Sequence, residues 1–317
     1  MKTNIIFLCA LLFLCTQCGS SEMVPQKLIL DTDISSDADD VGAVAVLHAL
    51  AREQRADILA VMVSSGDPFS APAVSVLNHY FQKPDIPVGR VARPRATHES
   101  SYSETLATMF AGARDIYPDS VGLYRKMLAA QPDHSVTIVT IGFLTNLADL
   151  LVSAGDQHSP LGGSELVRKK VKLLVCMGGD YPQGKEWNFY QDARSAQQVV
   201  QNWPTRIVFV GFSLGLQVLT GQPLREAPES SPVKQVYLLH NQFAGRPSWD
   251  QLAVLYAGLD EQSREQVFTT SEPGVNEVSA DGANSWQSKR SGTHYFVHPI
   301  EASKALTDRI NDMMQSR

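Results

Sequence analysis

Five aspartates crowd into ten positions near the start of the chain, in the stretch DTDISSDADD: Asp31, Asp33, Asp37, Asp39 and Asp40. Carboxylates this close repel one another and raise one another's pKa, so a chain tolerates them on a solvated loop or around a cation. Hard divalent cations such as Ca²⁺ take carboxylate oxygens as ligands. The cluster therefore indicates a metal site. An acidic surface turn with Asp as a helix cap is the plainer alternative.

Two other acidic patterns resemble this stretch in part. An EF-hand loop needs Gly where Ser36 stands and a bidentate Glu where Gly42 stands, so that pattern fails. An aspartyl phosphatase uses a first Asp as nucleophile and the Asp two residues later as acid, and Asp31 and Asp33 have that spacing. A metal-dependent phosphatase is thus an alternative, although no phosphate-binding Lys has an evident position.

Apolar runs on both sides of the aspartates predict the elements that hold them. Residues 28–30 are typical of a buried strand, and residues 41–50 of a helix. A strand, an acidic loop and a helix would place the carboxylates at the carboxyl end of the strand. Open α/β sheets bind their ligands at that edge.

The chain continues with the same alternation. Strands are predicted at 56–64, 86–89, 136–141, 171–177 and 206–210, and helices at 71–81, 120–130, 144–151 and 194–202. This pattern predicts an α/β fold: a single domain with an open, mostly parallel sheet flanked by helices. Residues 93–118 are irregular, with prolines and Ser/Thr, and are expected to form a mobile flap.

The composition is that of a globular protein, with 317 residues, 19% of them charged, and a net charge of −6. It gives no indication of nucleic-acid binding. Residues 1–23 read as an export signal, with Lys2 before an apolar run at 5–15 that is too short to span a bilayer. Residues 24–317 would be the mature domain.

Cysteine usage agrees with export to a bacterial envelope. Cys18 followed by Gly-Ser-Ser is similar to a lipoprotein cleavage site, which predicts a lipid anchor at Cys18 and a place in the periplasm or outer membrane. Simple signal cleavage nearby is the alternative. Only Cys176 lies in the mature domain, in an apolar run, so we expect a buried core cysteine and no disulfide.

Five short motifs occur in order along the chain: LILDTD with its Asp-Asp pair, TIGFLTNLA, MGG, EWNFYQD and SWD. Together they resemble the inosine–uridine preferring nucleoside hydrolase family over residues 28 to about 310. DTDISSDADD is two residues longer than the commoner D-x-D-P-G-x-D-D and resembles a divergent bacterial, lipoprotein-like branch. The resemblance implies a Ca²⁺-dependent enzyme of purine or pyrimidine salvage that hydrolyses the N-glycosidic bond of ribonucleosides to ribose and free base.

The resemblance also implies residue roles. Asp33 would be the general base that activates a water at the calcium ion. The metal ligands would be Asp33, Asp40, Asp250 and the backbone carbonyl of Ile141. The expected substrate contacts are Asp37, Asp39, Asp67, Met177, Glu186, Asn188, Trp249 and Asp250. Such carboxylates suit the reaction, because positive charge develops on the sugar in an oxocarbenium-like transition state.

Several positions depart from the family pattern. Trp249 stands where many members carry a His, which removes an acid for the leaving base and offers a ring to stack on it. Asp67 stands where an Asn usually follows Gly, and the loop from Gly179 to Glu186 lacks the usual ribose-binding Asn. These changes spare the metal and ribose residues but alter the surroundings of the base and of the sugar's 5′ end. A non-catalytic nucleoside-binding lipoprotein is therefore the alternative from another class.

The remaining motifs have plainer interpretations. We interpret Thr145-Asn146 as a helix cap and the scattered histidines as structural or surface residues, with His98 in the flap singled out for testing. Ser213 in GFSLG matches the nucleophile elbow, but residues 216–221 predict no helix after it. Trp187 and Trp249 suit a core and a pocket equally well. The expected partner is a small-molecule nucleoside, and the sequence leaves self-association open.

Overall fold

The computed structural model describes residues 24–114, 116–299 and 303–317. Its centre is an 11-stranded sheet in the order β3-β2-β1-β4-β5-β7-β13-β11-β12-β6, with β10 paired to β13. The strands of this sheet are β1 (Gln26–Thr32), β2 (Ala56–Val63), β3 (Val88–Arg90), β4 (Val136–Thr140), β5 (Val171–Met177), β6 (Gln183–Lys185), β7 (Arg206–Val210), β10 (Phe268–Thr270), β11 (Gly274–Val278), β12 (Ala283–Ser288) and β13 (His294–Pro299). A separate two-stranded ribbon pairs β8 (Leu219–Thr220) with β9 (Arg246–Pro247).

The sheet has a parallel part and an antiparallel part. Strands β3, β2, β1, β4, β5 and β7 pair in parallel, and β13 joins β7 in parallel as well. Beyond β13, the strands β11, β12 and β6 are antiparallel to their neighbours. The prediction of a single α/β domain with a mostly parallel sheet is confirmed, and the antiparallel end is an addition that the sequence analysis did not contain.

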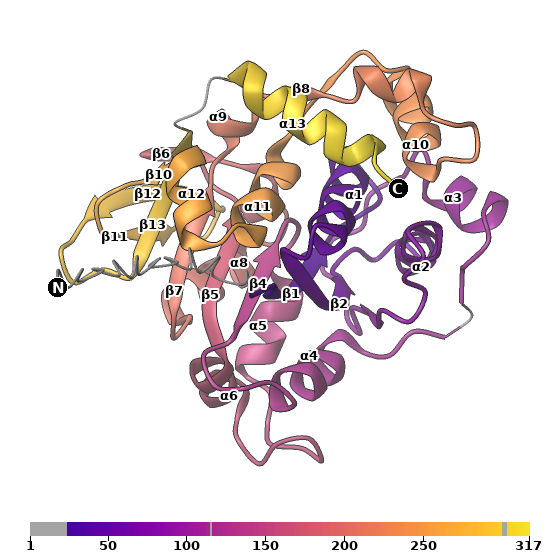
Figure 1. Cartoon of the computed structure of the whole chain (residues 1–317). Helices are drawn as coiled ribbons and strands as arrows, with labels where there is room; N and C mark the ends of the chain where they lie inside the picture. The colour runs from indigo at the N-terminus through magenta and orange to yellow at the C-terminus, as the bar shows by residue number, and fades with distance from the viewer. Residues whose placement is uncertain (1–23, 115, 300–302) are drawn as a thin grey trace, which may run out of the picture.

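Helices cover both faces of the sheet. Figure 1 shows α1, α11 and α13 on one side of the central strands and α4, α5 and α6 on the other. The helices are α1 (Asp39–Arg52), α2 (Ser70–Tyr80), α3 (Ser103–Met109), α4 (Ser120–Ala129), α5 (Thr145–Leu151), α6 (Gly163–Lys170), α7 (Trp187–Gln191), α8 (Ala193–Asn202), α9 (Phe212–Gly215), the 3₁₀ helix η1 (Gln222–Glu226), α10 (Pro232–Asn241), α11 (Trp249–Gly258), α12 (Glu261–Val267) and α13 (Ser303–Gln315).

Two apolar cores lie on the two faces of the sheet. Alternate residues of β1 point to opposite faces, so Leu28 and Leu30 belong to one core and Ile29 to the other. Helix α1 is buried along nearly its whole length, which explains why its sequence shows little amphipathic pattern.

The order of strands places a switch point between β1 and β4. The chain runs from β1 through α1 to β2 and through α2 to β3 on one side, and then returns to β4 on the other side of β1. The loops after β1 and β4 therefore diverge and leave a crevice at the carboxyl edge. Within it, the amide of Ile141 donates to the carbonyl of Asp31 at 2.8 Å and aligns the two strand ends.

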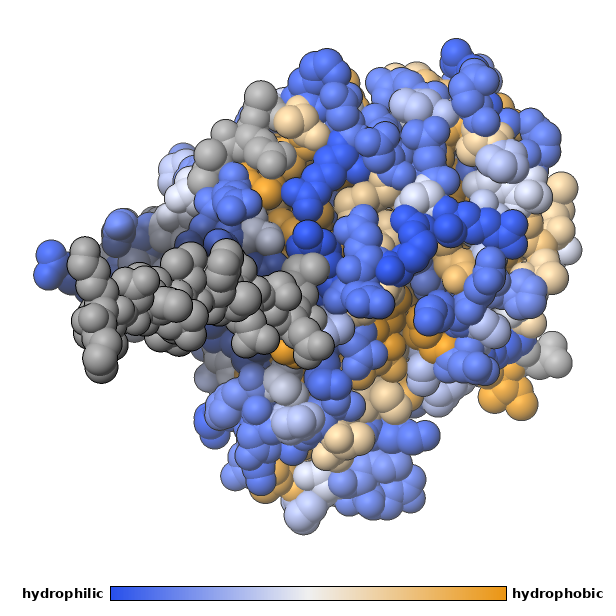
Figure 2. All heavy atoms as spheres, viewed as in Figure 1, coloured by the Kyte–Doolittle hydropathy of each residue, from blue (hydrophilic) through white to orange (hydrophobic). Residues whose placement is uncertain are grey.

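The expected flap is partly helical. Within residues 93–118, the described part contains α3, and Arg95 binds Asp149 at 2.7 Å. The surface seen in Figure 2 is mainly hydrophilic with scattered apolar patches. Among the described residues, no helix is long and apolar enough to cross a membrane. The export signal at residues 1–23 lies outside the described residues.

Candidate active site

A pocket of about 340 Å³ opens at the carboxyl edge of the parallel strands. It is lined by Asp33, Ser36, Asp37, Asp39, Asp40, Ile141, Met177, Glu186, Trp187, Asn188, Phe212, Arg246, Trp249 and Asp250. Every residue predicted to hold metal or substrate lines this pocket except Asp67. We call it the acid pocket. Part of its wall comes from the carboxyl ends of β1, β4, β5 and β7 and the segments directly after them, as expected for parallel strands whose ends meet at one edge, and the rest comes from α7, β9 and α11.

Three of its carboxylates converge from two packed helices. Asp39 and Asp40 lie in the first turn of α1 and Asp250 in the first turn of α11, where helix dipoles favour negative charge. One carboxylate oxygen from each lies within 4.8 Å of the others. This trio contains Asp39 in place of the expected Asp33, whereas Asp40 and Asp250 belong to both sets.

Asp33 lies directly after β1, beside the trio. A Cβ atom at Gly142 would lie 2.4 Å from the Asp33 amide nitrogen and 2.6 Å from its Oδ1, so only glycine lets the two loops approach this closely. The pKa of Asp33 is raised to about 8, mainly by burial, with the negative charge of Glu186 contributing to the shift. A cation bound nearby would therefore favour the ionised form of Asp33 at neutral pH.

Glu186 and Asn188 also line the pocket. The Glu186 carboxylate caps α7 by accepting hydrogen bonds from the amides of Asn188 at 2.8 Å and Phe189 at 3.3 Å, and it also accepts from the amide of Gly179 at 3.1 Å. Asn188 Nδ2 donates to the carbonyl oxygens of Ile141 at 3.1 Å and Met177 at 3.3 Å. The backbone carbonyl of Ile141, which is predicted to ligate the metal, thus lies beside the predicted ribose contacts.

The carboxylates of the acid pocket fit a hard divalent cation. Burial raises the pKa values of Asp39, Asp40 and Asp250 well above the ordinary range, and repulsion among them raises these values further. They cannot all ionise without a compensating charge. An all-oxygen set of carboxylates and a backbone carbonyl is the environment that Ca²⁺ prefers. The residues present therefore suit a metal ion of this kind.

Asp31 lies behind the acid pocket and does not line it. Its carboxylate has no exposed surface and accepts hydrogen bonds from Tyr124 Oη at 2.8 Å and Asn146 Nδ2 at 3.1 Å. The phosphatase alternative, which uses Asp31 as nucleophile, is wrong for this geometry. The interpretation of Thr145-Asn146 as a helix cap is wrong too, because Asn146 binds Asp31 and Thr145 Oγ1 donates to Asp192 at 2.6 Å.

Asp67 and His98 lie near the acid pocket without lining it. The Asp67 carboxylate accepts from the Phe69 amide at 2.9 Å and from Ser103 Oγ at 2.6 Å, which joins the start of α2 to α3. His98 packs against Trp187, with ring centroids 4.8 Å apart, and its Nε2 is buried without a hydrogen-bond partner. Both residues therefore hold the flap beside the site.

Arg246 is a pocket residue that the sequence analysis missed. Its Nε donates to Asp37 at 2.8 and 3.0 Å, and its Nη2 donates to the same carboxylate. Asp37, expected to contact substrate, therefore forms an ion pair with Arg246. The two residues are 209 positions apart in the chain, and no local pattern connects them.

Trp249 forms an aromatic wall of the acid pocket. Its ring stacks on Phe212 with centroids 5.3 Å apart, and its Nε1 donates to the Phe212 carbonyl at 2.8 Å. The ring also packs tightly on α9, since a Cβ atom at Gly215 would lie 2.0 Å from Trp249 Cδ1. Trp249 is thus a fixed surface, and Trp187, 40% exposed, stands at the pocket's edge.

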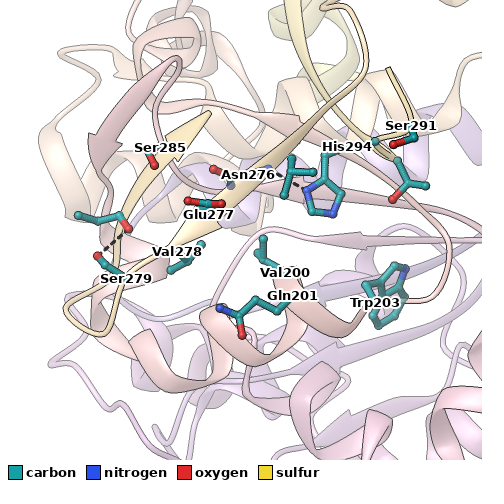
Figure 3. Close-up of a pocket in the computed structure, with 14 residues that line it drawn as sticks. Val200, Gln201, Trp203, Asn276, Glu277, Val278, Ser279, Ser285, Ser291 and His294 are labelled. Atoms are coloured by element: carbon teal, nitrogen blue, oxygen red, sulfur yellow. Dashed lines mark hydrogen bonds between the residues drawn. The ribbon is translucent and has the colours of Figure 1, made fainter. Parts of the chain in front are cut away.

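A second, larger hollow of about 580 Å³ lies between α8 and the antiparallel strand β11 (Figure 3). His294 is buried in its wall, and its Nδ1 accepts from the Asn276 amide at 2.9 Å. Glu277 is the one carboxylate in the lining, so nothing there resembles the acid pocket. Ser213 belongs to neither hollow: it is exposed and its Oγ donates to Asp180 at 2.8 Å.

Several solved structures with a similar fold are named as nucleoside hydrolases. The inosine-uridine preferring nucleoside hydrolase of Bacillus anthracis superposes with a TM-score of 0.69 at 15% identity, covering 92% of this chain and 99% of that one. The purine-preferring ribonucleoside hydrolase of Gardnerella vaginalis gives 0.67, also at 15% identity and covering 92% and 99%. A plant nucleoside hydrolase, PpNRh1, gives 0.66 at 17% identity and covers 92% and 100%. At this identity, the likeness establishes the fold.

The family of the chain is given by its sequence. The model of the inosine-uridine preferring nucleoside hydrolase family matches residues 28–297. The chain belongs to this family, as its five motifs indicated, and its activity class is that of an N-glycosidase. No curated protein shows a significant sequence match.

Proposed function

We propose that the protein hydrolyses ribonucleosides to ribose and free base with a bound Ca²⁺ ion and with Asp33 as the general base. One observation carries the proposal: carboxylates from the end of β1 and from the first turns of α1 and α11 converge on a single pocket. The same pocket supplies the polar groups of Glu186 and Asn188 for a bound sugar.

The proposed ligands of the cation are Asp33, Asp40, Asp250 and the carbonyl of Ile141. Asp40 is held in place because Thr32 Oγ1 donates to its Oδ1. When bound, a Ca²⁺ ion supplies a Lewis acid that lowers the pKa of a water and orients the ribose diol. Asn188, which also contacts the Ile141 carbonyl, links this side of the pocket to the sugar side.

The protein's own side chains bind the sugar and accept the proton of the water. Asp39 and Asp250 bind ribose hydroxyls, and Glu186 with Asn188 binds the rest of the sugar beside the backbone of Met177. Asp33 accepts the proton of the attacking water. The surrounding carboxylates stabilise the positive charge of the oxocarbenium-like transition state electrostatically.

The test is to incubate the purified mature domain with purine and pyrimidine ribonucleosides and to measure free ribose and free base. We expect ribose and base in equal amounts. 2′-Deoxyribonucleosides are the matched controls, and they should react far more slowly because one hydroxyl of the diol is missing. Tight nucleoside binding without ribose release would favour the binding-protein alternative.

We also propose that the protein is exported and lipid-anchored at Cys18, which rests on Lys2, the apolar run and the Cys-Gly-Ser-Ser stretch. A Cys18→Ser variant should lose its lipid and leave the membrane fraction for the soluble envelope fraction. Metabolic labelling with a fatty acid gives a direct readout. Unchanged labelling and fractionation of the variant would contradict an anchor at Cys18.

A further inference from the structure

Breaking an N-glycosidic bond leaves negative charge on the departing base. The carboxylates of the acid pocket stabilise the sugar cation but repel this second charge. Enzymes meet such a demand with a proton donor or with a fixed hydrogen-bond donor aimed at the developing charge. No histidine lines the acid pocket in the described part of the chain, so the donor is another residue.

Arg246 is the one cationic side chain in the described lining of the acid pocket. Its guanidinium lies 5.1 Å from the ring of Trp249, the residue predicted to stack on the base, whereas the carboxylate trio is proposed to hold the metal and the ribose. Ser36 and Trp187 also carry donors there, but both are neutral. Hydrogen bonds from a charged donor are about twice as strong as neutral ones.

The guanidinium keeps one donor group free. Its Nε and Nη2 are used by Asp37, whereas Nη1 has no partner among the described residues. The side chain remains 34% exposed. Because Arg246 cannot release its proton near neutral pH, Nη1 is a permanent donor rather than an acid.

Asp37 is itself held in a fixed position. Tyr102 Oη donates to the Asp37 carbonyl at 2.6 Å, and His240 Nε2 lies 3.5 Å from Asp37 Oδ1. The same loop is tied to α2 by Ser70 Oγ, which donates to the Ile34 carbonyl. These contacts fix the carboxylate that orients Arg246.

We propose that Arg246 is a catalytic residue that binds the leaving base through Nη1 and stabilises its negative charge, with Asp37 as its positioning residue. The inference rests on the proposed hydrolysis of nucleosides. The C1′–N bond breaks with its electron pair on the base while the water oxygen bonds to C1′. Asp33 takes the water's proton and later releases it to solvent, and the departing base takes one proton from solvent, so the overall reaction adds one water. The bases that fit carry an acceptor, such as a carbonyl oxygen or ring nitrogen, facing Arg246.

The experiment compares two leaving groups in the full-length mature enzyme. Inosine and uridine release bases that need stabilisation, whereas 4-nitrophenyl riboside releases a phenolate that is already a stable anion. Arg246→Gln should lower kcat on the nucleosides by roughly 10²–10³-fold, the usual effect of removing one such donor. It should change hydrolysis of the aryl riboside only a few-fold, which also shows that the variant folds.

Further variants separate the roles. Arg246→Lys keeps the charge and should recover part of the nucleoside activity. Asp37→Asn should show the same selectivity with a smaller loss. Arg225→Gln removes a guanidinium that packs on Phe243 outside the acid pocket, and it should behave as wild type.

Equal losses on both substrates, or no loss on either, would overturn the inference. Equal losses would mean that Arg246 only holds the Asp37 loop in place. Failure of the proposed function gives a different result. In that case the wild-type protein itself releases no ribose from any nucleoside.

Discussion

Two hollows in this molecule lie against different kinds of strand edge. The acid pocket, of about 340 Å³, opens where the carboxyl ends of parallel strands meet. The larger hollow, of about 580 Å³, lies beside the antiparallel strand β11 (Figure 3). In the acid pocket, buried carboxylates repel one another, and Arg246 is the one cationic side chain among the described residues that line it. Beside β11, the side chains already satisfy the backbone of the strand.

The details of β11 make the contrast concrete. The amide of Asn276 donates to His294 Nδ1, and the carbonyl of Val278 accepts from Gln197 Nε2 at 2.9 Å. These side chains bond backbone groups of β11 beside the hollow, where β11 pairs with β13 only at Gly274, while β12 pairs with β11 on its other side. This comparison indicates that uncompensated buried charge, rather than volume, distinguishes the acid pocket from the hollow beside β11.

Removal of the metal should have the largest effect, and only in the acid pocket. Without a cation, the clustered carboxylates repel one another, so activity should disappear on treatment with a chelator. At free Ca²⁺ about 1,000-fold above its Kd, the ion should add about 4 kcal/mol to the free energy of unfolding. Thermal unfolding and elemental analysis of the purified protein are the measurements. A protein that contains no divalent metal and is not stabilised by Ca²⁺ would contradict the assignment.

Asp33→Asn tests the general base. The amide oxygen can still coordinate a cation, but it cannot accept the water's proton. We expect kcat to fall roughly 10²–10⁴-fold while nucleoside affinity changes little. Glu277→Gln makes the same kind of change in the hollow beside β11 and should leave kcat as it is. A comparable loss from both variants would show that the two hollows do not differ as described.

The sequence predicted the parallel part of the sheet well because its strands are apolar runs bounded by glycine. Strands β5 and β7 have the predicted bounds of 171–177 and 206–210. Strands β11 (GVNEV) and β12 (ANSWQS) escaped prediction, since neither is an apolar run: β11 buries the polar Asn276, and β12 is largely polar and partly exposed. The resemblance named most of the residues that line the acid pocket. It missed Arg246, because the ion pair with Asp37 exists only once distant segments meet.

Local interpretation failed where tertiary contacts decide. Thr145 and Asn146 begin α5, as good capping residues do, but their side chains bind Asp192 and Asp31 instead. Asp67 follows Gly66 as the family position does, yet its carboxylate joins α2 to α3. In both cases the residue type suited the local position, whereas the partner came from a segment that the sequence does not place.

Low pH should reduce the stability of the protein through His294, which lies in the wall of the hollow beside β11. Burial lowers the pKa of His294 to about 4 from 6.5, so the unfolded chain binds a proton more readily than the folded one. Its contribution to stability is therefore complete above pH 6.5 and is lost as pH falls through 4, by up to about 3 kcal/mol.

A His294→Asn variant isolates this effect. The Asn amide oxygen can accept the Asn276 amide as Nδ1 does, but it does not titrate. Urea unfolding between pH 7 and pH 4 should show a weaker loss of stability on acidification in the variant, with nucleoside activity at neutral pH retained. Identical pH dependence in the two proteins would contradict a role for His294 in acid sensitivity.

A matched pair of tryptophans provides the finest comparison of the two hollows. Trp249 lines the acid pocket and donates from Nε1 to the Phe212 carbonyl at 2.8 Å, while Trp203 lines the other hollow and donates to Thr205 Oγ1 at 3.0 Å. Both are nearly buried, at 9% and 6% exposure.

Replacing either with Phe should cost about 1 kcal/mol of stability, because each loses one hydrogen bond. Only Trp249→Phe should also weaken substrate binding, by about 1 kcal/mol or roughly fivefold in KM, since Trp249 is the one of the two that is proposed to face the base. Steady-state kinetics and urea unfolding measure the two effects separately. A KM that rises equally in both variants would mean that the effect reflects general loosening of the fold, and the assignment of Trp249 to the base side of the acid pocket would be lost.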